Sequence, residues 1–152
     1  MQNAGTSGTV DAILQQKGRN VWSVPPSVTV FEAIQLMADK NVGALLVMEA
    51  GQLVGIMSER DYTRKVALQG RLSRETTVRE ILSDQVVVVR PDTTIEECMR
   101  LMTANYVRHL PVVDEGRVVG VVSIGDLVNW IISAQSAMIQ QLQCYITGTY
   151  PD

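Results

Sequence analysis

Two short motifs hold the residues of this sequence that could do chemistry, Ser58-x-x-Asp61 and Ser123-x-x-Asp126. Each follows an apolar run that predicts a strand, and each opens a predicted helix. A helix N-terminus presents free N–H groups and the positive end of its dipole, so a phosphate can bind there beside the serine hydroxyl. An aspartate one turn further on can accept hydrogen bonds from two neighbouring ribose hydroxyls. Together these groups fit a nucleotide.

A plainer explanation of the same residues is helix capping, because serine at an N-cap with an acid three residues later starts a helix. A nucleotide site also needs positive charge, since a nucleoside phosphate carries about two negative charges near neutral pH. The candidates are Arg60, Arg108 and His109. Arg60 could equally be a solvated arginine, and His109 a core histidine. Both alternatives stay open at this point.

The two motifs are equivalent points of an internal repeat. Residues 24–62 align with residues 89–127 without a gap, at a spacing of 65 residues, and 14 of the 39 pairs are identical. The likeness extends upstream, where Thr9–Leu14 matches Thr77–Leu82. Such self-similarity indicates a tandem architecture. We therefore expect a disordered N-terminus at 1–8, a first repeat at 9–70, a linker at 71–76, a second repeat at 77–134, and a C-terminal helix extension and tail at 135–152.

Each repeat predicts the order strand, helix, hairpin, helix, after a short leading helix. Thr29 with Glu32, and Thr94 with Glu97, have the Thr-x-x-Glu spacing of a capping box at the start of the first long helix. Apolar residues at i, i+3, i+4 and i+7 follow, which indicates one buried face. The strands are expected at 21–24 and 86–89, and the hairpins at 44–48 with 53–57 and at 110–113 with 118–122.

The last predicted helix is longer than its repeat requires. Its apolar residues recur at intervals of three and four and include Ile131, Ala134, Met138, Leu142 and Tyr145. A stripe of this length packs either across the other repeat or against a second molecule. We expect the second of these, a homodimer, because two-fold dimers are the commonest oligomers.

Composition narrows the class of protein. A chain of 152 residues with 46% hydrophobic content suits one compact domain or two small units. The N-terminus resembles no signal peptide and no run spans a bilayer, so we expect a cytoplasmic protein without membrane contact. The net charge of −3 argues against nucleic acid. Cys98 and Cys144 lie in apolar helical patterns, which favours buried thiols over metal ligands. A single histidine and no catalytic constellation predict no enzymatic activity.

The repeat order, the Gly-apolar-x-Ser-x-x-Asp pattern at 55–61 and 120–126, and the run RHLPVVD at 108–114 resemble a tandem pair of CBS domains, the Bateman module. The run SERDYTRKV at 58–66 resembles short stand-alone CBS-pair proteins of bacteria and plant organelles. The resemblance implies a mixed α/β (α+β) fold in which the repeats pack with pseudo-two-fold symmetry. It also implies clefts between the repeats for adenosine ligands such as AMP, ADP, ATP or NAD(H).

The resemblance also assigns roles to individual residues. Asp61 and Asp126 would hold ribose, and Ser58 and Ser123 would hold phosphate. The phosphate side would include Arg60, Arg108 and His109, and the adenine walls would be Val42, Ala44 and Val107. The implied function is regulation of an unidentified protein in trans, without catalysis. The alternative is a ligand-free scaffold for dimerisation or interaction.

Overall fold

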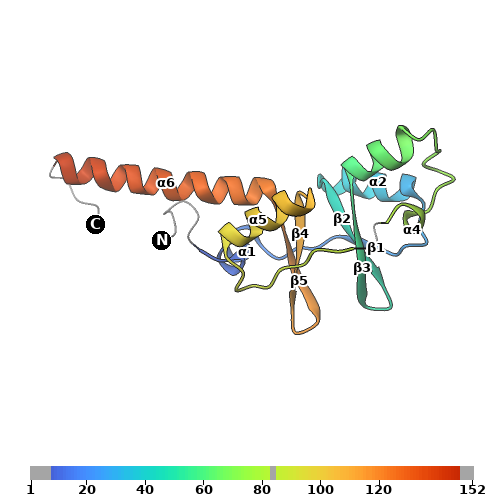
Figure 1. The fold of residues 1–152 in the computed structure, drawn as a ribbon, viewed down its shortest axis with the longest axis horizontal. Helices are drawn as coiled ribbons and strands as arrows, with labels where there is room; N and C mark the ends of the chain where they lie inside the picture. The colour runs from blue at the N-terminus through green and yellow to red at the C-terminus, as the bar shows by residue number, and fades with distance from the viewer. Residues whose placement is uncertain (1–7, 83–84, 148–152) are drawn as a thin grey trace. The chain divides into compact units, whose positions relative to one another are not determined.

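The computed structural model describes residues 8–82 and 85–147 (Figure 1). The N-terminal segment predicted to be disordered therefore lies outside the described residues, except for Gly8. The chain divides into two compact units, and each is described by itself. Unit 1 comprises described residues 8–19, 88–114 and 120–147, and unit 2 comprises 20–82, 85–87 and 115–119.

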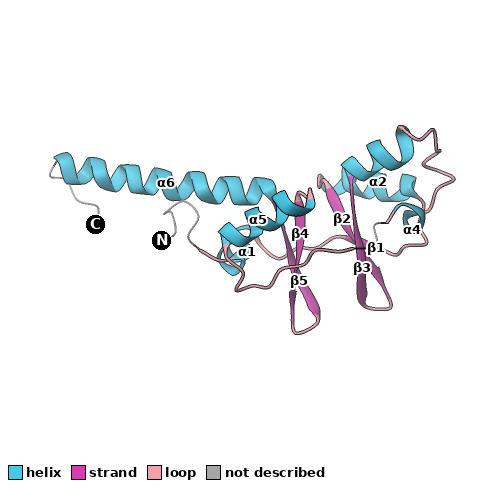
Figure 2. Cartoon of the chain, viewed as in Figure 1, coloured by secondary structure: helices cyan, strands magenta, loops and turns pink. Residues whose placement is uncertain are grey.

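Unit 2 is built on a three-stranded sheet in the order β1-β2-β3 (Figure 2). Strand β1 (Ser23–Val24) runs parallel to β2 (Ala44–Glu49), and β2 forms an antiparallel hairpin with β3 (Gln52–Ser58). The tight turn places both Ala50 and Gly51 at positive φ, as hairpin turns of the primed types require. The predicted hairpin is confirmed, whereas the first strand is shorter than the predicted 21–24.

Helices cover this sheet and close the core of unit 2. They are α2 (Val30–Lys40), α3 (Glu59–Tyr62), the π-helix η2 (Thr63–Ala67) and α4 (Val78–Ile81). The buried cluster consists of apolar side chains from all parts of this unit, namely Val24, Val30, Ala33, Met37, Leu45, Val47, Met57, Val66, Val78 and Ile81. The buried residues of α2 recur at the three- and four-residue spacing expected of one helix face.

Unit 1 repeats this plan with a smaller sheet. Its strand β4 (His109–Asp114) pairs with β5 (Arg117–Ser123), of which residues 120–123 belong to this unit, in the second hairpin, and α5 (Ile95–Asn105) precedes them. The predicted strand at 86–89 is reduced to a single parallel bridge between Val89 and Val112.

The two predicted capping boxes have different outcomes. Thr29 and Glu32 form a complete box at the start of α2, with both reciprocal hydrogen bonds present. At α5 only half of the box forms: Thr94 Oγ1 accepts from Glu97 N at 3.1 Å, but the Glu97 carboxylate binds Arg100 instead. A guanidinium one turn along the helix offers two charge-assisted hydrogen bonds, which compete successfully with one backbone N–H.

The leading helix of each repeat lies in the unit formed mainly by the other repeat. Helix α1 (Val10–Lys17) belongs to unit 1, where Val10 N donates to Thr93 O at 2.9 Å. Helix α4 belongs to unit 2, where Val78 N donates to Val28 O at 2.9 Å. The compact units thus differ from the sequence repeats, whose predicted boundaries stay a prediction.

The last element of the described residues is α6 (Ile124–Thr147), 24 residues long, which confirms the predicted long last helix. Leu127 near its start is fully buried in unit 1. Along the described part of the chain, no helix combines the length and the apolar character that a bilayer crossing requires.

Candidate functional site

Each Ser-x-x-Asp motif lies where a strand passes into a helix, as predicted. In unit 2, Asp61 N donates to Ser58 Oγ at 3.2 Å, and Asp61 Oδ2 accepts from Ser58 N at 2.8 Å. In unit 1, Asp126 N donates to Ser123 Oγ at 3.2 Å, and Asp126 Oδ2 accepts from Ser123 N at 2.8 Å. The capping interpretation is therefore confirmed at both motifs.

A lysine that the sequence reasoning missed accompanies each aspartate. Lys17 Nζ of α1 lies 2.7 Å from Asp126 Oδ2 and donates to Val121 O at 2.9 Å. Lys65 Nζ lies 3.5 Å from Asp61 Oδ1 and donates to Ile81 O at 2.9 Å. Lys65 was detectable as an i,i+4 partner of Asp61. Lys17 was not, because it is separated from Asp126 by 109 residues and has no lysine counterpart in the second repeat.

The Lys17–Asp126 pair forms part of the wall of a pocket between α1 and α6, with a volume of about 190 Å³. Asn129, Trp130 and Ser133 of α6 complete its polar side. Sites that enclose a drug-sized ligand usually measure about 300–1,000 Å³. This pocket is smaller than that range, so a whole nucleotide would extend beyond it.

The start of each hairpin lies beside the start of the helix in the same motif. Ile124 N of α6 donates to Arg108 O at 2.8 Å, and Glu59 N of α3 donates to Gly43 O at 3.0 Å. In unit 2, Ala44 is the register partner of Ser58. The structure thus brings Arg108 and His109 close to the Ser123 motif, and Ala44 close to the Ser58 motif.

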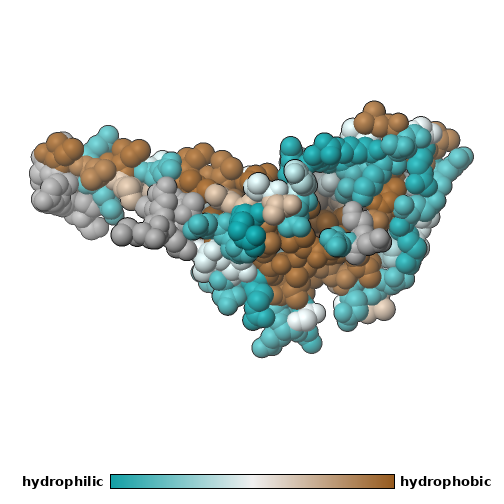
Figure 3. Space-filling view, in the orientation of Figure 1, coloured by the Kyte–Doolittle hydropathy of each residue, from teal (hydrophilic) through white to brown (hydrophobic). Residues whose placement is uncertain are grey.

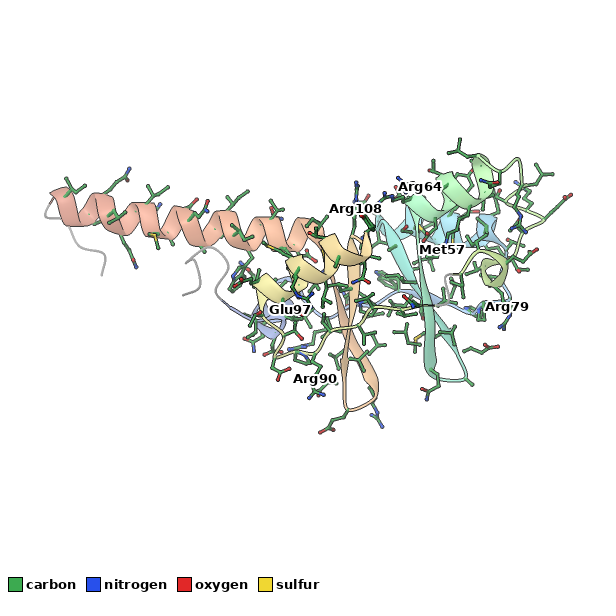
Figure 4. All side chains as sticks on the ribbon, viewed as in Figure 1. Met57, Arg64, Arg79, Arg90, Glu97 and Arg108 are labelled. Atoms are coloured by element: carbon green, nitrogen blue, oxygen red, sulfur yellow. The ribbon has the colours of Figure 1, made fainter. Side chains whose placement is uncertain are left out.

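The charge of the predicted arginines is available for a ligand. Among the described residues, Arg60 and Arg108 have no carboxylate within salt-bridge distance. Arg108 is exposed just before β4 (Figure 4), and Arg60 is half-buried. By contrast, Arg71 and Arg79 pair with Glu80 and Glu49. Arg60 lies in unit 2. The family resemblance implies that it reaches the phosphate of the cleft that contains Asp126, and this role stays a prediction. Val42 and Val107, predicted as adenine walls, are both half-buried.

The two cysteines differ in chemistry. Cys98 is fully buried on α5, and burial, with a smaller contribution from the negative charge of Glu97, raises the pKa of its thiol to about 11. Cys144 lies half-buried on α6. No group of three or more His, Cys, Asp or Glu side chains suited to a metal occurs among the residues that the structure describes.

We expect Cys144 to react with a thiol reagent such as Ellman's reagent at least about tenfold faster than Cys98 in the native protein at pH 8. The reason is that only about 0.1% of a thiol with this pKa is ionised at that pH, and the thiolate is the nucleophile. The Cys144→Ser variant should therefore lose the fast phase. Equal rates for both thiols, or a fast phase that survives this substitution, would contradict the assignment.

The fold and these motifs define a tandem CBS pair, and comparison with known proteins agrees. The chain belongs to the CBS domain family, whose model matches residues 17–68 and 78–133. It is 37% identical to the CBS domain-containing protein CBSX3, mitochondrial, of Arabidopsis thaliana, over 99% of this chain and 78% of that protein. It is 38% identical to YhcV of Bacillus subtilis (strain 168), over 77% of this chain and 83% of that protein.

Solved structures give the same result. The crystal structure of the CBS domain protein NE2398 is 49% identical, with a TM-score of 0.78 over 82% of this chain and 98% of that chain. A hexameric CBS-CP12 protein from bloom-forming cyanobacteria is 29% identical, with a TM-score of 0.73 over 80% of this chain and 67% of that chain. The fold is therefore the mixed α/β fold of two CBS repeats.

One more distant structure contains ligands. The CBS pair of MJ0100, in complex with 5′-methylthioadenosine and S-adenosyl-L-methionine, is 24% identical with a TM-score of 0.71 over 81% of this chain and 94% of that chain. At this identity the comparison shows the shared fold alone. The location predicted for the present protein, the cytoplasm, stays a prediction, and CBSX3 is named as mitochondrial.

Proposed function

We propose that this CBS pair is a non-catalytic regulatory module that binds an adenosine-containing ligand and acts, as a homodimer, on a partner protein in trans. The observation that carries the proposal is the grouping in unit 1 of an exposed, unpaired Arg108 with the capped helix start at Ser123 and Asp126. A cation, a hydroxyl and a carboxylate at a helix N-terminus match the phosphate and ribose of a nucleotide.

In the proposed complex, Asp126 and Asp61 accept hydrogen bonds from ribose hydroxyls. Every contact to Asp126 in the described structure falls on Oδ2, so Oδ1 is the oxygen that can accept from a ligand. Ser123 and Ser58 contribute to phosphate binding. Arg60, Arg108 and His109 supply positive charge or hydrogen bonds, and Val42, Ala44 and Val107 contact adenine. Lys17 adds a second cation beside Asp126.

The ligand class follows from these groups. Ribose and phosphate contacts are common to AMP, ADP, ATP and NAD(H), so the proposal covers all four. The adenosyl ligands of MJ0100 lie in a protein of the same fold, which makes the class chemically reasonable for this chain. A ligand that binds one conformation of the module more tightly than another shifts the module toward the favoured conformation. This shift would change the contacts that the module offers to the partner protein.

Calorimetric titration with AMP, ADP, ATP and NAD tests the proposal. We expect heat of binding with at least one of them, and a roughly tenfold or larger rise in Kd for Asp61→Asn and for Asp126→Asn, since each loses a charge-assisted hydrogen bond. Asparagine keeps an oxygen that can accept from the serine N–H, so the cap survives. Asp92→Asn is the matched control, because the Asp92 side chain is 80% exposed in unit 1.

Two results would overturn the proposal. One is the absence of binding heat from the wild-type protein at millimolar nucleotide. The other is binding that both motif variants leave unchanged. The absence of binding heat would favour the ligand-free scaffold. In a scaffold the serine and aspartate of each motif need only cap a helix, as they are observed to do.

A further inference from the structure

Helix α6 has a second apolar stripe that unit 1 does not cover. This outer stripe consists of six residues at successive intervals of four, three, four, three and four, namely Val128, Ile132, Gln135, Ile139, Leu142 and Ile146. Its apolar members have 44–82% of their surface exposed, and Gln135 is exposed as well. Figure 3 shows hydrophobic surface along the upper edge of α6. The spacing is the heptad pattern of a coiled-coil seam.

The outer stripe differs from the stripe expected from the sequence. Ile131 and Ala134 are half-buried and share a helix face with the fully buried Leu127, to which they are i+4 and i+7. The first part of the expected stripe therefore lies on the core-facing side of α6, and its predicted role in a dimer contact stays a prediction. Leu142 belongs to both stripes, and the side chain of Tyr145 lies outside the described residues.

The charge pattern of α6 indicates what covers the outer stripe. From Leu127 to Thr147 the sequence contains no Asp, Glu, Lys or Arg. Two copies of this segment can therefore pack side by side without repulsion between like charges. A helix that lies on a lipid surface usually carries Lys or Arg on its polar face, which this segment lacks. An exposed helix without charge pairs also gains little stability alone, so it benefits from a partner helix.

We propose that the outer stripe is the seam of a parallel two-stranded coiled coil with α6 of a second molecule of this protein. In the parallel register each residue meets its own equivalent, so Gln135 meets Gln135 and the two amides can bond to each other. An antiparallel register would place Gln135 opposite Ile139 and bury an amide against an apolar side chain, which costs free energy. The inference rests on the homodimer part of the proposed function and is independent of the nucleotide.

Sedimentation velocity of the full chain at micromolar concentration tests the seam without any nucleotide present. The Ile132→Glu/Ile139→Glu variant should raise the dimer dissociation constant by at least about 100-fold, because charges would enter the seam. The control Ala137→Glu/Gln140→Glu adds the same charge at exposed positions on the side of α6 away from the seam and should remain dimeric. A monomeric wild-type protein, or a seam variant as dimeric as the control, would overturn the proposal.

The orientation of the helices has its own test. In a Cys144→Ser background, Ile146→Cys should form an intermolecular disulfide on mild oxidation, because equivalent residues adjoin in a parallel seam. In the antiparallel register the two cysteines would be about 27 Å apart, at 1.5 Å per residue, and could not bond. A dimer without this cross-link would overturn the parallel arrangement. Nucleotide titration of the Ile132→Glu/Ile139→Glu variant separates failure of the seam from failure of the ligand proposal.

Discussion

Leu14→Ala is expected to lower the free energy of unfolding of unit 1 by about 2–5 kcal/mol, the range for truncating a buried leucine. Leu14 has only 1% of its surface exposed. It belongs to α1, and its Cδ2 atom lies 2.7 Å from the point where a Cβ atom on Gly120 would be. Truncation would therefore leave a cavity directly against the backbone of β5, the strand that leads into the Ser123 motif.

Urea unfolding followed by tryptophan fluorescence measures this effect. The chain has two tryptophans, Trp22 in unit 2 and Trp130 in unit 1, so a Trp22→Phe background reports unit 1 through Trp130. Thr103→Ala is the control, because Thr103 is exposed on α5 of unit 1 and its truncation should change stability by less than about 0.5 kcal/mol. Equal losses for Leu14→Ala and Thr103→Ala would contradict the assignment of α1 to unit 1.

Gly120→Val is expected to destabilise unit 1 by about 1–3 kcal/mol through overpacking. A Cβ atom at this position would lie 2.7 and 2.9 Å from the two terminal carbons of Leu14, closer than van der Waals contact allows. Leu14 is fully enclosed and has little room to move. The same relation holds in unit 2, where a Cβ atom on Gly55 would lie 2.8 Å from Leu82 Cδ2.

A double-mutant cycle of Leu14→Ala and Gly120→Val measures the contact between the two positions directly. Because Leu14→Ala removes the atoms that a valine at 120 would strike, the double variant should be more stable than the sum of the single effects by about 1 kcal/mol or more. Gly125→Ala is the matched glycine control, since its Cβ atom would meet only Ser123 Oγ, at an ordinary 3.6 Å, and should cost nothing. Strict additivity between the two sites would refute the contact.

These contacts explain the glycine of each repeated motif in physical terms. At Gly55 and Gly120 no positive φ requires glycine. The requirement is the close approach of a leucine of the other repeat: Leu14 on α1 at Gly120, and Leu82, the residue after α4, at Gly55. Because α1 carries Leu14 and Lys17 three residues apart, the packing that needs Gly120 also brings a cation to Asp126. The core and the candidate site of unit 1 thus depend on the same helix.

The sequence by itself determined the features that depend on neighbouring residues. The repeat, both hairpins, the buried face of α2 and the cap at each Ser-x-x-Asp motif all follow from turn chemistry, period and spacing over a few residues. The capping box of Thr94 and Glu97, of which only half forms, shows that spacing does not always predict a hydrogen bond even between residues one turn apart. Glu97 had two partners within one turn, and spacing alone could not decide that Arg100 would take the carboxylate.

Only the tertiary structure decided where α1 packs, which lysine pairs with Asp126, why Gly120 is a glycine, and which stripe of α6 stays exposed. Lys17 and Asp126 are separated by most of the chain, and Leu14 and Gly120 by nearly as much. No local preference encodes such a pairing. It arises when whole elements find the arrangement that buries their apolar faces, and helical periodicity shows that a face is apolar without showing which partner covers it.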